Sequence, residues 1–251
     1  DQIYVGGYVG RGNIAIPGLP YGILEGELIR RDYGSLDGTD HTQVHWDDRT
    51  GYTPIVNANG GYQFLGYGVI GNPQPDYVYG VTNTLSYKWA TLRVQFDSQV
   101  GGDVFSTTNS TLLGRGILQE TDFDRFVPVV TNGLSADGTP NTTQTTANAH
   151  YWPNTGVFYD ENSIYDASVM RLREVSLSFV APKSFLNGTP FGNASLTLSA
   201  QNIWHYAWNT PSGTNFDPEV ISYGAGSNAR GFDEMTGPTA KKYGATLSLT
   251  F

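Results

Sequence analysis

The clearest pattern in the sequence is an alternation of apolar and polar residues over positions 79–97. In its second half every even position is apolar and every odd position is polar, as a β-strand requires when its two faces meet unlike environments. In its first half only Asn83 breaks the alternation. Lys88 and Trp89 lie between the halves, so the pattern predicts a tight β-hairpin with a two-residue turn.

Three further segments alternate in the same way and predict strands at residues 169–180, 194–201 and 242–251. The first of them changes phase near Arg173 and Glu174, which indicates either a β-bulge or the point where the strand leaves a membrane. These strands hold about 9 to 12 residues, enough for a tilted strand to cross a bilayer. Strands of soluble proteins are usually shorter, at about 5 or 6 residues.

The connections between these strands alternate between short and long. The short ones cover residues 88–89 and 181–193, and the long ones cover roughly residues 32–76, 98–168 and 203–241. Outer-membrane barrels have short periplasmic turns and long extracellular loops. If the last strand ends in the periplasm, the two short connections are periplasmic and the three long loops are extracellular. The pattern therefore predicts an all-β chain that belongs to a transmembrane antiparallel β-barrel.

Composition supports strands and polar loops. Only 15% of the residues are charged, while 31 are Gly and 16 are Tyr. Mean hydropathy is −0.31 and no long apolar run exists, which argues against a helical membrane protein. The formal net charge of −9 argues against nucleic acid as a partner, because a phosphate backbone requires a basic stripe. Without Cys, no disulfide or thiolate site is available.

The parity of each strand predicts which side chains face the pore. An Arg on the lipid face near the bilayer midplane costs about 2–4 kcal/mol, so charged positions belong inside. Seven residues are predicted to face the lumen: Arg93, Gln95, Asp97, Ser195, Thr197, Ser199 and Gln201. Seven are predicted to face lipid: Leu92, Val94, Phe96, Leu196, Leu198, Leu247 and Leu249. The lumen residues either hydrate the pore or contact substrate. For Arg171 and Arg173, parity leaves both faces open.

Aromatic residues in the long loops are candidates for contact with a substrate or a lid protein: Tyr151, Trp152, Trp204, Tyr206 and Trp208. They would stack on sugar rings. The alternative, which we prefer, is loop packing or an aromatic girdle at the membrane interface, where we also place Trp89.

No catalytic or metal site is predicted, nor any cofactor or enzymatic activity. His41 and His45 lie four residues apart near several Asp residues, but nothing around them suggests the helix that a metal pair at this spacing needs. Asp160, Glu161 and Asp166 are no more clustered than in an ordinary acidic loop.

Several short motifs, in order, resemble the late barrel of the SusC/RagA-type TonB-dependent transporters. Residues 71–77 read GNPQPDY, 99–105 read QVGGDVF, and 169–179 read VMRLREVSLSF. Residues 18–23 (GLPYGI), 198–203 (LSAQNI), 216–219 (FDPE) and 247–251 (LSLTF) add to the likeness. The family's acidic loop is not matched, because residues 45–52 read HWDDRTGY.

The resemblance implies that residues 1–251 are the C-terminal portion of a barrel with 22 strands, supplying about the last five to seven. No plug or TonB-contacting segment is recognisable, and no signal peptide precedes Asp1, so we expect further sequence upstream. The implied function is import of a bulky nutrient, an oligosaccharide or a peptide, across the bacterial outer membrane. The implied partners are a SusD-like surface lipoprotein, TonB, outer-membrane lipid, and the barrel-assembly machinery, which would read the terminal Phe251.

Other functions remain compatible with the sequence. A SusC-like barrel could serve as a scaffold in an outer-membrane complex, and a passive porin would lack the plug. A soluble all-β carbohydrate-binding module would also account for aromatic loops and acidic charge.

Overall fold

The computed structural model describes residues 2–34, 45–155, 158–210, 213–214, 216–219, 228–237 and 239–251. The chain divides into two compact units, each assembled from three separate stretches of sequence. We call residues 76–100, 168–208 and 238–251 the sheet unit, and residues 1–75, 101–167 and 209–237 the connection unit.

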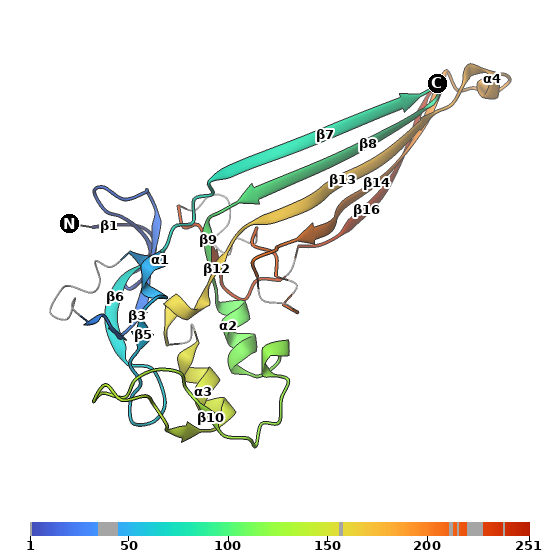
Figure 1. The fold of residues 1–251 in the computed structure, drawn as a ribbon. Helices are drawn as coiled ribbons and strands as arrows, with labels where there is room; N and C mark the ends of the chain where they lie inside the picture. Colours follow the sequence, from blue (N-terminus) through green and yellow to red (C-terminus); the bar gives the residue numbers. More distant parts are fainter. Residues whose placement is uncertain are drawn as a thin grey trace. The chain divides into compact units, whose positions relative to one another are not determined.

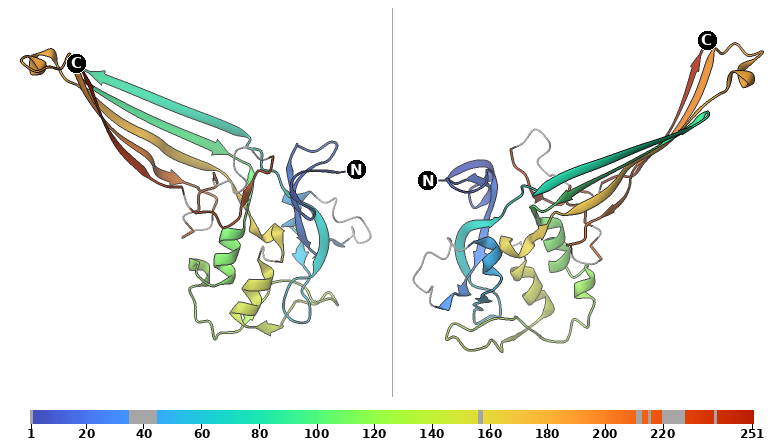
Figure 2. Two further views of the ribbon diagram at one scale, coloured as in Figure 1. Left: turned by 180° about the vertical axis from the view of Figure 1, so that it is seen from behind. Right: turned by 45° about the horizontal axis from the view of Figure 1, so that its top comes forward.

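The sheet unit is one antiparallel sheet of five strands in the order β16-β14-β13-β8-β7. The strands are β7 (Tyr77–Tyr87), β8 (Ala90–Val100), β13 (Val169–Val180), β14 (Asn193–Tyr206) and β16 (Lys242–Thr250). They run side by side in every view (Figures 1 and 2). The four alternating segments form five strands, as predicted. Strand β14 continues beyond its predicted end to Tyr206, so the expectation that Trp204 and Tyr206 lie in a long loop is wrong.

Both short connections are as predicted. Lys88 and Trp89 form the two-residue turn of the β7–β8 hairpin, and Lys88 adopts a left-handed backbone with φ of 52°. The connection from β13 to β14 contains the one-turn helix α4 (Lys183–Leu186). Because neighbouring strands are antiparallel, these two connections leave the same end of the sheet, which we call the turn end.

A pair of bulges interrupts the sheet at one level. Leu172 and Glu174 of β13 pair with adjacent residues of β8, so Arg173 is the extra residue of a bulge. On the other side, Leu172 and Glu174 pair with Trp204 and Gln201 of β14. Two residues of β14 therefore lie opposite Arg173, so β14 has one extra residue relative to β13. The phase change read from the sequence is thus a bulge.

The connection unit contains a sheet of four strands in the order β1-β2-β3-β6. These are β1 (Ile3–Tyr8), β2 (Arg11–Ala15), β3 (Ile23–Ile29) and β6 (Phe64–Gly71). Two-stranded pairs are formed by β4 (Arg31–Asp32) with β5 (Thr53–Pro54) and by β10 (Val129–Val130) with β11 (Gln144–Thr145). A further sheet places β9 (Asp103–Ser106) between β12 (Ile164–Asp166) and β15 (Phe232–Asp233), the last pairing parallel.

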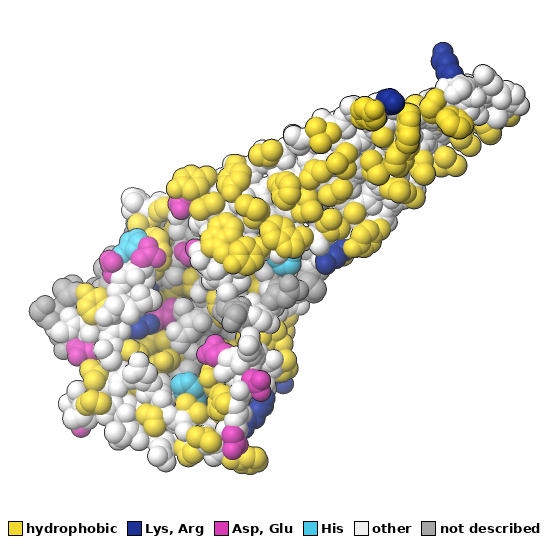
Figure 3. Space-filling view, turned by 45° about the vertical axis from the view of Figure 1, so that its right-hand side comes forward, with side chains coloured by type: hydrophobic (Ala, Val, Ile, Leu, Met, Phe, Trp, Pro, Cys, Tyr) yellow, Lys and Arg dark blue, Asp and Glu magenta, His cyan; other side chains and the backbone are white. Residues whose placement is uncertain are grey.

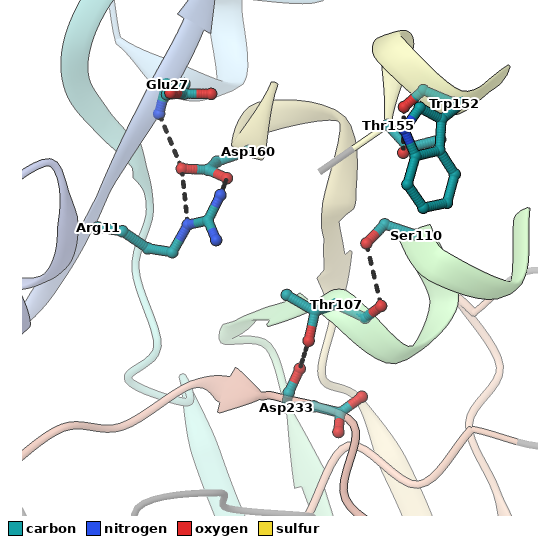
Figure 4. Close-up of polar contacts among 8 residues, drawn as sticks. All are labelled: Arg11, Glu27, Thr107, Ser110, Trp152, Thr155, Asp160 and Asp233. Carbon is teal, nitrogen blue, oxygen red and sulfur yellow. Dashed lines mark hydrogen bonds and ion pairs between the residues drawn. The ribbon is translucent and has the colours of Figure 1, made fainter. Parts of the chain in front are cut away.

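Short helices complete this unit: α1 (Trp46–Arg49), α2 (Thr107–Gly114), α3 (Ala147–Asn154), and the 3₁₀ turns η3 (Gln119–Thr121) and η4 (Asp160–Ser163). The N-terminus of α2 is capped by Ser106, whose Oγ accepts from the Asn109 amide at 3.1 Å and donates to Asp233 at 2.7 Å. Thr107 donates to the Asp233 carbonyl at 3.0 Å (Figure 4). A buried carboxylate therefore ties β15 to α2.

The core of the connection unit draws on all three of its stretches. Leu24 and Ile70 come from the first, Phe105 from the second and Phe232 from the third. The Phe105 and Phe232 rings meet edge to face at 5.7 Å. The sequence predicts long loops at residues 32–76, 98–168 and 203–241 and no element at residues 1–31, whereas the described residues of these stretches form a compact unit. No local periodicity signals it, because the apolar partners lie far apart in the chain.

Candidate functional site: a two-faced sheet and a buried ionic cluster

One face of the five-stranded sheet is apolar across its whole width. Directly paired residues point to the same side of an antiparallel sheet. One such row across the strands reads Leu85, Leu92, Leu177, Leu198 and Ala245. Hydrophobic side chains cover this face in Figure 3. We call it the apolar face.

The seven residues predicted to face lipid all lie on the apolar face, because each pairs into a row of this side. Among the described positions, Asn83 and Ser98 interrupt the face, and the Ser98 hydroxyl is satisfied by the Val169 carbonyl at 2.9 Å. Leu247 on the β16 edge is 65% exposed. Contact of these residues with lipid stays a prediction.

The opposite face, which we call the polar face, gathers the seven residues predicted to line a lumen. Arg93 pairs with Ser176, which pairs with Ser199, and Gln95, Glu174 and Gln201 form the next row. Ser178 and Thr197 exchange a hydroxyl hydrogen bond at 2.9 Å. The structure thus brings the seven predicted lumen residues onto one side. Substrate contact by any of them stays a prediction.

The bulge decides the facing of the two arginines of β13. Arg171 pairs in register with Asp97 and His205 and is buried. Arg173, the bulged residue, donates from Nε and Nη2 to the two carboxylate oxygens of Asp97 at 2.8 and 2.7 Å. The extra residue turns both side chains towards the polar face, and the bidentate geometry makes this the strongest ionic contact of the sheet.

Three of the five predicted aromatic contact residues belong to the sheet unit. Trp204 and Tyr206 pair with Leu172 and Met170, so both lie on the apolar face. The Tyr206 ring is stacked on Trp204, with ring centroids 6.4 Å apart, and tilted against Trp208, with ring centroids 6.5 Å apart. On the apolar face these rings form an aromatic end opposite the turn end, which favours the girdle interpretation over substrate contact.

The other two aromatic candidates lie in α3 of the connection unit. Trp152 packs against α2, where a Cβ on Gly114 would come within 3.0 Å of its ring, and Arg115 lies over that ring at 5.3 Å. Trp152 is therefore a packing residue. Tyr151 lines a hollow of about 140 Å³ together with Phe123 and Arg125, so it is the one of the pair that a ligand could reach.

Asp160 is the centre of an ionic cluster in the connection unit (Figure 4). The carboxylate is fully buried, ion-paired with the Arg11 guanidinium, and accepts the Glu27 backbone amide at 3.0 Å. Burial raises the pKa of Asp160 above its ordinary value, and the Arg11 charge opposes that rise. Burial and the Asp160 charge also raise the pKa of Glu27.

A second buried pair adjoins it. Arg31 donates to Glu161 at 2.7 Å, and burial raises the pKa of Glu161. Arg49 donates to the Val69 carbonyl at 2.5 Å, and burial lowers the pKa of Arg49. The expectation of an ordinary acidic loop is therefore wrong for Asp160 and Glu161. Their arginines are 149 and 130 residues away, a separation that no local pattern reveals.

Each of these two carboxylates is held by its own guanidinium, so the cluster joins parts of the chain that lie far apart in sequence. Asp166 accepts an amide from Asn209 at 2.6 Å. Within the described part of the chain, no group of three or more His, Cys, Asp or Glu side chains is arranged to hold a metal ion. None of the described helices has the length and apolar character needed to cross a membrane.

The histidines occupy local structural positions. His45 caps α1, accepting the Asp47 amide at 3.4 Å, and its ring stacks on Trp46 at 3.8 Å. The expectation that nothing near His45 is helical is therefore wrong, because the one-turn helix α1 begins at the next residue. His41 lies outside the described residues. His150 contacts the Thr131 hydroxyl at 2.9 Å, and burial lowers its pKa.

Two curated proteins of Formosa agariphila are similar to this chain in sequence. TonB-dependent receptor P3 is 26% identical over 213 residues, which is 78% of this chain and 18% of that protein. TonB-dependent receptor P26 is 27% identical over 192 residues, 73% of this chain and 18% of that protein. The chain thus spans less than a fifth of the length of these relatives. No family model matches it.

Solved structures of the RagAB peptide importer match the fold of the whole chain. The closed-closed state of the importer matches with a TM-score of 0.55 and 18% identity. The match covers all of this chain and 25% of the importer chain. The RagAB peptide transporter and the open-open state each give 0.54, with 19% and 16% identity and 25% and 24% of those chains. The sequence relatives confirm the resemblance to TonB-dependent receptors, and the solved structures confirm the expected all-β fold of antiparallel strands, which do not close into a barrel among the described residues.

Proposed function

We propose, from the chain's likeness to SusC/RagA-type TonB-dependent transporters, that it forms part of the wall and outer loops of an outer-membrane importer. Residues 1–251 would be the C-terminal portion of the barrel. The apolar face would contact lipid, and the polar face would line the lumen. The three long connections would face the outside of the cell and the turn end the periplasm.

The apolar face, which among the described positions is interrupted at Asn83 and Ser98, is the observation that carries this proposal. Strands β7 and β8 hold 11 residues each. At about 3.3 Å per residue and a tilt of about 45°, such a strand rises about 25 Å, which is the height of the apolar band of outer-membrane barrels. Aromatic residues stand near both ends of the face, Tyr79 and Tyr206 at one and Tyr87 and Trp89 at the other.

The polar face suits a hydrated pore. It carries hydroxyls and amides, and its Asp97–Arg173 pair is already neutralised by bidentate contact. Such a wall exposes polar groups to passing solute. No bond is made or broken in this account.

We infer the cargo and partners from the relatives. RagAB is a peptide importer, so a bulky nutrient, either a peptide or an oligosaccharide, is the proposed cargo. A SusD-like surface lipoprotein is the proposed lid, with Tyr151 as a contact candidate. TonB would act through regions outside this chain, and Phe251 would direct the barrel-assembly machinery to the last strand.

A soluble carbohydrate-binding module fits less well. It would leave the apolar face in water over five strands, whereas contiguous exposed patches of monomeric soluble proteins rarely exceed a few hundred Å². The strand edges of β7 and β16, each paired on one side only among the described strands, would also stay open.

Facing is tested in the full-length protein by arginine at neighbouring positions of β14. Leu198→Arg places a charge in the middle of the apolar face and should destabilise the barrel by about 2–4 kcal/mol. Ser199→Arg, its matched control on the polar face, should cost far less because water solvates the guanidinium. The measurement is the unfolding midpoint in urea with lipid vesicles, followed by heat-modifiable gel mobility. Equal losses for the two variants would refute the facing.

A further inference from the structure

The turn end of the sheet carries an apolar hollow that the importer function does not use. Its volume is about 310 Å³, and its walls include Trp89, Phe179, Pro182, Phe185, Leu196 and Leu247. Trp89 and Phe179 pack with ring centroids 5.6 Å apart. Phe185 of α4 is 77% exposed, so an aromatic side chain stands open at the rim of the hollow.

Main-chain hydrogen bonds hold the hollow together. The Val180 amide donates to the Trp89 carbonyl, and the Ala181 amide donates to the Ala194 carbonyl, both at 2.8 Å. These bonds fasten the β7–β8 turn and the start of the α4 connection to the same end of the sheet. The hollow is therefore a feature of the paired strands rather than of one loop.

The charged side chains in the strand ends and connections at this end are both lysines. Across residues 84–92, 177–197 and 245–250, the charged side chains are Lys88 and Lys183, in a chain whose formal net charge is −9. The Lys88 ammonium lies 5.2 Å from the centre of the Tyr87 ring, which places the charge at the margin of the apolar face. Lys183 is exposed and directly follows Pro182, a wall residue of the hollow.

We propose that the turn end is a binding site for an anionic glycerophospholipid. An acyl chain would lie in the hollow, and the phosphate would meet Lys88 and Lys183. This inference rests on the proposed function, because it requires the apolar face to be in a bilayer with the turn end at a headgroup region.

Three observations select this occupant. The hollow opens on the apolar face, where lipid chains would already lie. Its rim is basic, and basic residues at a membrane surface attract anionic headgroups. Trp and Tyr, the residue types of its margin at Trp89 and Tyr87, are those enriched at headgroup level. A peptide segment would instead need polar main-chain partners, and the walls are almost entirely apolar side chains.

The test uses the full-length protein in nanodiscs of phosphatidylcholine doped with a photoreactive lipid. The probe is either phosphatidylglycerol or phosphatidylcholine with a crosslinking group on the acyl chain, and labelled peptides are mapped by mass spectrometry. We expect the phosphatidylglycerol probe to label residues 179–196 preferentially. The double variant Lys88→Gln/Lys183→Gln should lower that labelling by about 25-fold, or about fivefold for each lysine. Labelling by the phosphatidylcholine probe should not change.

Two further variants sharpen the result. Ala194→Trp fills the hollow and should remove labelling of residues 179–196 by both probes, while leaving labelling of β8. Lys242→Gln, a lysine at the other end of the sheet, should change nothing. Equal labelling by the two headgroups, or an unchanged double variant, would overturn the lipid site and leave the importer proposal standing. If neither lipid probe labelled any peptide of the apolar face, the proposal that this face contacts the membrane would be overturned instead.

Discussion

Asp160 shows how single residues brace the connection unit. Its carboxylate has no exposed surface, and burial alone favours the protonated form. The Arg11 guanidinium and the Glu27 amide stabilise the charged form instead. A buried pair of this kind contributes little net stability when intact, but removing one partner leaves an uncompensated charge.

Arg11→Met should therefore destabilise the connection unit by about 3 kcal/mol near neutral pH. Without the guanidinium, the pKa of Asp160 in the folded state rises further above its unfolded value. The native state then binds more protons than the unfolded state, so the loss grows as pH rises through that pKa and shrinks on acidification. Hydrogen exchange of β3 and residues 158–166 in the full-length protein measures the effect.

Arg30→Met is the matched control, because Arg30 is exposed on the strand connection next to β3. It should leave exchange unchanged at every pH. If Arg11→Met lost the same stability at acidic and neutral pH, the variant would be acting through lost packing against Phe105, over which the guanidinium lies at 5.1 Å, and not through the Asp160 charge.

At the scale of elements, the strands of the sheet unit were predictable from the sequence, and the strands and helices of the connection unit were not. A period of two, sustained over β8, β14 and β16, leaves one solution for which residues share a face. In the sequence, the bulge at Arg173 is visible as a change of phase in the alternation. The sequence does not show which strand holds the extra residue, and that decides the face on which Arg171 lies. Helices α2 and α3 have no clear apolar stripe, so the periodicity of the sequence does not predict them.

The extra residue of β14 gives a test of the bulge itself. Asn202 has a left-handed backbone with φ of 53°, a conformation that Asn and Gly tolerate and β-branched residues resist. Asn202→Val should lower stability by about 1–2 kcal/mol, whereas Asn202→Gly should cost a few tenths of a kcal/mol. Urea unfolding of the full-length barrel compares them. A Val variant as stable as the Gly variant would show that the strand runs without this bulge.

At the scale of the whole molecule, the five strands are incomplete as a membrane structure. Lipid does not tolerate open strand edges, and this chain spans only 18% of its curated relatives. The remaining wall, and any plug, must come from other parts of a longer protein for the proposed importer to work.

Import is tested in cells with and without the full-length protein. Loss of the protein should abolish uptake of labelled peptides or oligosaccharides, because these solutes are too large for porins. An uncoupler of the proton-motive force should abolish the same uptake, because a hydrated wall alone does not move cargo uphill. Entry of a small porin solute should continue. Uptake that survives the uncoupler would indicate a passive pore, and unchanged uptake without the protein would favour a scaffold.

The shared core of the connection unit has a consequence for biogenesis. Leu24, Phe105 and Phe232 reach that core from three stretches that are separated in the chain by membrane-length strands. The first stretch has an apolar cluster of its own at Ile14, Ile23 and Val69, but the shared core around Phe105 cannot form before Phe232 is present. In the proposed barrel, the connection unit would therefore be completed only after residue 232 has been exported, and an arrested intermediate would expose the apolar side chains of this core to proteases.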